Sequence, residues 1–230
     1  FDQVMKRVFV VFTIFIFGSA AIIYLNLDWQ KQRKLPVFQP KDINPELVDS
    51  ILHGRGRGIN GGDHHISNFK LTNQLNQAVS KTVMENKIIV ANFFFVSCPS
   101  ICPKMTQNLF TVHQQYIKDS SVLILSHTVW PEVDSPEVLL KYAEKYNVDH
   151  SKWLFLTGSK NELYRLARQD YLVVPDVNDP NFQHGSDADF IHTENIVLID
   201  KKQRIRGFYD GTEFQEMNRL IEDIEILKKS

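Results

Sequence analysis

The organisation of this chain is decided by one stretch, Phe93-Phe94-Phe95-Val96-Ser97-Cys98-Pro99-Ser100-Ile101-Cys102-Pro103. It contains both cysteines of the 230 residues and directly follows an apolar run that predicts a buried strand. Cysteines four residues apart are about one helical turn apart, so a helix that begins here places both sulfurs on one face. Such a pair can form a disulfide, bind a soft metal or attack a disulfide of another protein. We therefore predict that Cys98 and Cys102 form the functional centre.

Composition and charge argue against a nucleic-acid-binding protein. The chain has 26 basic and 27 acidic residues and a net charge of -1, whereas nucleic-acid binders carry a strong basic excess. The arginine–glycine run at 54–58 is better interpreted as a flexible linker than as an RNA-binding segment.

An apolar block near the N-terminus predicts a membrane anchor. Residues 8–27 contain no charge, and twenty such residues are the length that crosses a bilayer as a helix. A cleaved signal peptide is the competing interpretation, because Gly18-Ser19-Ala20-Ala21 offers small residues. The apolar run continues beyond them, so we favour an uncleaved transmembrane helix at 8–27 after a short flank at 1–7.

The remaining chain divides into a tether and one domain. Residues 28–68 are expected to be a linker, since they contain two prolines near 36–40 and a glycine-rich run at 54–62. Residues 69–230, about 160 in number, suit a single compact core.

The apolar pattern of this domain predicts alternating strands and helices. A hairpin is expected around 69–79, then strands at 88–96, 122–125, 153–156, 196–199 and 204–209. Helices are expected at 101–117, 136–146, 159–168 and 212–228, with Ser135, Ser159 and Thr212 as N-caps. A loop is expected at 174–189. This order predicts an α/β sandwich around a central mixed sheet.

The predicted order of elements is that of a thioredoxin-like fold. A strand leads to a cysteine pair at a helix start, and β-α-β and a closing hairpin and helix follow. Within that superfamily the sequence resembles the Sco/SenC family of membrane-anchored copper proteins of cytochrome c oxidase assembly. The matching segments are 69–74, 98–103, 135–139, 156–159 and 189–193. One departure is Ser100, where many relatives carry an acidic residue between the cysteines. This difference bears on the pKa of the thiols or on the choice of partner, and it leaves the ligand atoms and the class of protein unchanged. The resemblance implies a three-layer sandwich with a central mixed sheet.

The resemblance also implies a copper site formed by Cys98, Cys102 and His192. Thiolates suit Cu(I), and imidazole suits copper in either oxidation state. The implied role is that of a metallochaperone that assists assembly of the dinuclear copper site in a cytochrome c oxidase subunit. The implied location is the bacterial cytoplasmic membrane with the domain on the periplasmic side. The mitochondrial inner membrane, with the domain facing the intermembrane space, is the alternative.

A second function fits the same cysteines. A thiol–disulfide oxidoreductase would act on cysteines of the oxidase subunit or of another exported protein, so whether the chain is an enzyme is left open. Thioredoxins usually have two residues between their cysteines and this chain has three, which weakens this interpretation. A thiol peroxidase and a four-ligand zinc site are less favoured.

Other residues near these motifs receive simpler interpretations. His184, in the expected loop, and the pair His64-His65, in the tether, are rival ligands to His192. His127, at the end of an expected strand, is not favoured as a ligand. Residues 130–134 predict a solvated connection, which we prefer to a partner-docking surface.

Overall fold

The computed structural model describes residues 3, 5, 7, 11–19, 34–42, 64–173, 191 and 193–229. The chain divides into two compact units, Phe1–Leu35 and Pro36–Ser230, and each is described by itself.

The larger unit is built on one mixed sheet. Its described strands are β1 (Lys70–Asn73), β2 (Ala78–Ser80), β3 (Ile88–Phe94), β4 (Val122–Thr128), β5 (Trp153–Thr157), β6 (Asn195–Ile199) and β7 (Ile205–Asp210). Their order in the sheet is β2-β1-β5-β4-β3-β6-β7. The central strands β3, β4 and β5 pair in parallel, whereas β1, β2, β6 and β7 join by antiparallel pairing. The expected α/β fold with a central mixed sheet is confirmed.

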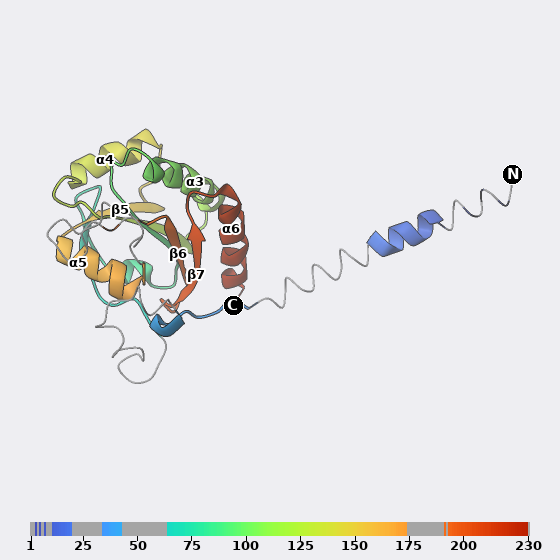
Figure 1. Ribbon diagram of the computed structural model, residues 1–230. Helices are drawn as coiled ribbons and strands as arrows, with labels where there is room; N and C mark the ends of the chain where they lie inside the picture. The colour runs from blue at the N-terminus through green and yellow to red at the C-terminus, as the bar shows by residue number, and fades with distance from the viewer. Residues whose placement is uncertain are drawn as a thin grey trace. The chain divides into compact units, whose positions relative to one another are not determined.

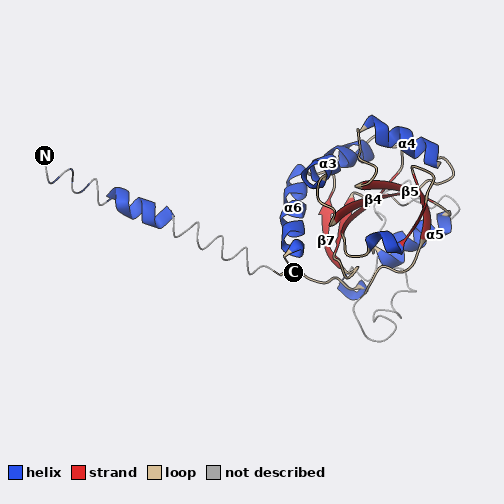
Figure 2. Cartoon of the chain, turned by 180° about the vertical axis from the view of Figure 1, so that it is seen from behind, coloured by secondary structure: helices blue, strands red, loops and turns tan. Residues whose placement is uncertain are grey.

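Helices cover both faces of this sheet. The helices α3 (Ile101–Tyr116), α4 (Pro136–Lys145) and α6 (Phe214–Lys228) lie on one side, and α5 (Lys160–Arg165) lies on the other (Figures 1 and 2). A π-helical turn, Leu166–Asp170, continues α5, and short 3-10 helices occupy Pro40–Asp42 and Lys81–Met84. Every residue of β3 and β4 is buried, which agrees with the nearly continuous apolar run of β3 and with the four apolar residues that begin β4.

Two of the three predicted N-caps are confirmed. The hydroxyl oxygen of Ser135 accepts the Val138 N–H, and that of Ser159 accepts the Glu162 N–H, both at 3.3 Å. The prediction for Thr212 is wrong. Its hydroxyl donates to the Asp210 carboxylate at 2.7 Å, and α6 begins two residues later, at Phe214. The Thr212 hydroxyl is oriented toward the turn before the helix, and Glu213 takes the N-cap position of α6.

Parts of the expected tether pack against the hairpin formed by β6 and β7. The N–H of Phe38 donates to the Ile205 carbonyl at 2.9 Å, and the N–H of Ile66 donates to the Gln203 carbonyl at 3.1 Å. Ile66 is fully buried. Residues 36–42 and 64–68 thus belong to the packed unit.

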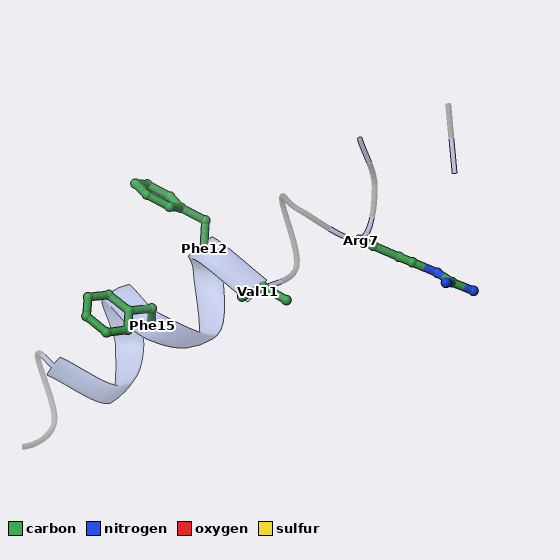
Figure 3. A pocket seen from close by; sticks show the side chains of 4 residues that line it. All are labelled: Arg7, Val11, Phe12 and Phe15. Carbon is green, nitrogen blue, oxygen red and sulfur yellow. The ribbon is translucent and has the colours of Figure 1, made fainter. Parts of the chain in front are cut away.

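A helical segment in the first unit covers residues 11–19, and the described residues 3, 5 and 7 are helical as well. Its apolar side chains are exposed, as Phe12 and Phe15 illustrate, and together with Arg7 and Val11 they line an open hollow (Figure 3). None of the described residues forms a helix long and apolar enough to cross a membrane. The transmembrane helix expected at 8–27 extends beyond the described residues and stays a prediction.

Candidate functional site

The cysteine pair lies where the fully buried strand β3 passes into α3. Residues 95–100 form the connecting loop, and Cys102 is the second residue of the helix. Cys98 and Cys102 are both free thiols, with exposed fractions of 5% and 3%. We refer to residues 95–100 as the cysteine loop. The sequence-based expectation of a strand, a cysteine pair and a helix in this order is confirmed.

One hydrogen bond joins the two cysteines across the first helical turn, and a second holds Cys98 to the start of the cysteine loop. The Cys102 N–H donates to Cys98 Sγ at 3.5 Å, and the Cys98 N–H donates to the Phe95 carbonyl at 3.3 Å. Ser100 immediately precedes α3, but its side chain makes no capping hydrogen bond. The Cys98 sulfur therefore serves as the acceptor that an N-cap side chain would otherwise provide.

The two thiols are electrostatically unequal. Burial acts to raise the pKa of Cys98, but the N–H groups of Cys102 and Ser100 donate to its sulfur and bring the pKa below the ordinary value. Burial raises the pKa of Cys102 to about 12, and the charges of Cys98 and Asp134 act in the same direction. In the metal-free pair, Cys98 is the sulfur that ionises first, and the thiolate is the form that binds copper or attacks a disulfide.

A buried carboxylate beside this pair was not predicted. We expected Asp134 to lie in a solvated connection. This prediction is wrong, because Asp134 is fully buried. One oxygen of its carboxylate, Oδ2, accepts the Thr128 hydroxyl at 2.5 Å and the Val96 N–H at 3.2 Å. Burial raises the pKa of Asp134, although these hydrogen bonds act to lower it. A carboxylate directly before a Ser-Pro helix start gives no sequence signal that it will turn inward.

The described histidines are engaged in other contacts. His127 lies fully buried with Nε2 3.4 Å from the Tyr171 hydroxyl, and His113 Nε2 accepts the Asp149 N–H at 3.2 Å. The rings of His64, His65 and His150 lie at hydrogen-bond distance from the Asp170 carbonyl, the Lys202 carbonyl and Gln74, respectively.

The predicted third ligand falls outside the described part of the chain. His192 and its rival His184 are not among the described residues. Within the residues that are described, no group of three or more histidine, cysteine or acidic side chains is arranged to hold a metal ion. The structure therefore brings Cys98 and Cys102 together, and the assignment of His192 stays a prediction.

Comparison with known proteins places this geometry in a family. The model of the family described as SCO1/SenC matches residues 57–229, which include the cysteine loop and most of the packed unit. The chain belongs to the SCO1/SenC family. The family identification made from the sequence is thereby confirmed.

Individual members of the SCO1/SenC family match over most of their length. The SCO1 protein homolog of Bacillus subtilis is 28% identical over 165 residues, 71% of this chain and 82% of the relative. The solved structure of BsSco, reported with a disulfide switch, is 26% identical with a TM-score of 0.59, covering 71% of this chain and 93% of BsSco. The copper-bound ScoI of Bradyrhizobium japonicum is 22% identical with a TM-score of 0.54, covering 70% and 98%. At that identity the last likeness establishes the fold alone.

Proposed function

We propose that this chain binds copper through Cys98, Cys102 and His192 and assists assembly of the dinuclear copper site in a cytochrome c oxidase. The observation that carries the proposal is the pair of free thiols one helical turn apart in a chain of the SCO1/SenC family. Two thiolates occupy two coordination positions of a soft cation, and an imidazole from another part of the domain would complete a three-ligand site. Copper is then a cargo that the protein passes on.

The local chemistry of the pair fits copper. Both cysteines are unpaired, and the N–H groups that donate to Cys98 favour the thiolate form that a metal requires. The copper-bound ScoI of Bradyrhizobium japonicum supports the same cargo by analogy, and BsSco is described as a member of a family of cytochrome c oxidase assembly proteins. The oxidase subunit that carries the copper site is the partner we propose.

The first test is the copper stoichiometry of the full chain. Purified protein is loaded anaerobically with Cu(I) and separately with Cu(II), and bound copper and the thiolate-to-Cu(II) absorption band are measured. We expect one copper per chain, and loss of the band in Cys98→Ser and in His192→Ala.

The matched control is His184→Ala, which removes the rival histidine. If His184→Ala abolishes the band and His192→Ala retains it, the third ligand has been assigned to the wrong residue. If the reduced wild-type protein retains no copper, the copper function is wrong.

Thiol–disulfide exchange is a second candidate, and the lowered pKa of Cys98 favours it. In the balanced reaction, the Cys98 thiolate attacks a partner disulfide and expels one partner thiolate. Cys102 loses its proton and attacks the Cys98 sulfur, so that the second partner thiol leaves and a Cys98–Cys102 disulfide forms. Exchange with a disulfide substrate should continue in His192→Ala, whereas copper binding should not, and this difference separates the two functions.

We also propose that residues 8–27 anchor the chain in a membrane. The tether predicted at 28–68 would connect this anchor to the domain at 69–230, with its described parts at 36–42 and 64–68 packed on that domain. The exposed apolar side chains of the helix over 11–19 support an apolar environment for that segment. The location proposed is the bacterial cytoplasmic membrane, with the domain on the periplasmic side. A chain lacking residues 1–27 should appear in the alkaline-carbonate supernatant, whereas the full chain should stay in the membrane pellet. Release of both would refute the anchor.

A further inference from the structure

The cysteine loop is attached to a second loop, residues 129–135, which connects β4 to α4. The Val96 N–H donates to Asp134 Oδ2 at 3.2 Å. The ring of Phe95 makes an edge contact with the ring of Trp130, with 6.0 Å between the centroids. Two contacts of different kinds, one polar and one aromatic, thus join consecutive residues of the cysteine loop to the neighbouring loop.

Asp134 is the centre of the polar attachment. Its Oδ2 accepts the Thr128 hydroxyl at 2.5 Å as well as the Val96 N–H, so one oxygen bridges the end of β4 to the cysteine loop. The Thr128 hydroxyl oxygen in turn accepts the Trp130 N–H at 2.9 Å. The Asp134 N–H donates to the Trp130 carbonyl at 2.9 Å, which closes the second loop on itself. The carboxylate is therefore held in a fixed place.

This arrangement is costly for folding. Asp134 is fully buried, and Oδ1, its second oxygen, has no hydrogen-bond partner among the described residues. An unpartnered buried oxygen of a carboxylate destabilises the native state, so stability alone does not account for an acid at this position.

We propose that Asp134 is a positioning residue for the cysteine pair: by bridging Thr128 to the Val96 N–H, it fixes the loop conformation in which Cys98 Sγ faces the first turn of α3. This inference deepens the proposed function and rests on it for the copper part. Asp134 would not bind the metal. It would orient the loop that carries the ligand Cys98, as groups that hydrogen-bond to metal-binding segments generally do.

The test uses the full chain and two measurements on each variant. The first is the dithiol–disulfide equilibrium of the copper-free protein with glutathione, and the second is the Cu(I) affinity in competition with bicinchoninate. Asp134→Ala removes the bridging oxygen, and we expect it to lower the Cu(I) affinity by about 10–100-fold and to displace the glutathione equilibrium. Asp134→Asn keeps an oxygen that can accept both bonds, so both values should stay within a few-fold of wild type.

The control is Ser135→Ala, which acts one residue away. It removes the cap of α4, because Ser135 accepts the Val138 N–H, but it leaves the Asp134 bridge intact. We expect it to lower the thermal midpoint without changing either measurement. If Asp134→Ala does not fold, Thr128→Val removes the other end of the bridge and takes its place.

Three results would overturn the inference. The first is a Cu(I) affinity and a glutathione equilibrium in Asp134→Ala equal to those of wild type. The second is a change in Ser135→Ala as large as that in Asp134→Ala. The third is an equally large change in Asp134→Asn, which would assign the effect to the charge of Asp134 and not to its position. Failure of the wild-type protein to bind Cu(I) would refute the proposed function instead. The glutathione equilibrium would then still decide the role of Asp134.

Discussion

Acid should destabilise the packed unit through one buried histidine. His127 is fully buried on β4, with its ring stacked on Phe93 at 5.0 Å between centroids and its Nε2 3.4 Å from the Tyr171 hydroxyl. Its Nδ1 has no hydrogen-bond partner among the described residues. Burial lowers the pKa of His127 from 6.5 to about 4, because a charged imidazolium cannot be hydrated in this place.

The sign and size of the effect follow from the difference between the pKa of His127 in the unfolded chain and its pKa in the folded chain. Above pH 6.5 the ring is neutral in both the folded and the unfolded chain, so its titration does not affect the free energy of unfolding. Between pH 6.5 and pH 4 the unfolded chain binds a proton that the folded chain does not, and unfolding becomes progressively easier. At about 1.4 kcal/mol per pKa unit, His127 should lower the free energy of unfolding by about 3 kcal/mol on going from pH 7 to pH 4.

The assay is urea unfolding of wild type and His127→Leu at pH 7, 5.5 and 4. Leucine fills most of the same apolar space and cannot titrate, so the stability difference between the two proteins should change by about 3 kcal/mol over this range in favour of the variant. The buried His113, whose pKa burial also lowers, is present in both proteins and cancels in the comparison. His65→Leu is the control for loss of an exposed histidine. A stability difference that is independent of pH would refute the reasoning.

Three further predictions concern the sheet, the thiols and a helix cap. Asp200→Ala removes the buried carboxylate to which Arg204 and Arg206 both donate, and should cost about 3 kcal/mol in urea unfolding; a loss below 1 kcal/mol would contradict this. Iodoacetamide should label Cys98 at lower pH than Cys102 in the reduced metal-free protein, as peptide mass spectrometry would detect, and the reverse order would contradict the pKa assignment. Ser159→Ala should cost about 1 kcal/mol by removing the acceptor of the Glu162 N–H, whereas Ser159→Asp should not.

Much of the fold could be predicted because its signals are local. The fully buried strand β3 is an apolar run, and the caps at Ser135 and Ser159 depend only on residues within one turn. The cap at Thr212 was predicted by the same rule and failed, because the Thr212 hydroxyl is oriented toward Asp210 and α6 begins with Glu213 at the N-cap position. Where two local rules compete for one side chain, the pattern alone does not choose between them.

The cysteine pair could also be predicted from spacing, but its surroundings could not. Asp134 lies 36 residues after Cys98 in the sequence, and its carboxylate meets the cysteine loop only because β3 and β4 pair in parallel and end at the same edge of the sheet. Neither the pairing nor the inward turn of this side chain is encoded in the residues next to it. A sequence therefore identifies the reactive atoms of such a site more readily than the groups that control them.

The parallel pairing of β3 and β4 has a consequence for how the site can move. Phe94 and Thr128 end the paired register, so the cysteine loop and the loop after β4 leave the sheet from adjacent positions. The Phe95–Trp130 contact joins them within two residues of that point, and the hydrogen bond from Val96 to Asp134, six residues after Thr128, joins them again. Trp130 is 37% exposed and Asp134 is fully buried, so the two contacts join the loops both at the surface and in the interior. A displacement of either loop must therefore move the other loop or break one of these two contacts.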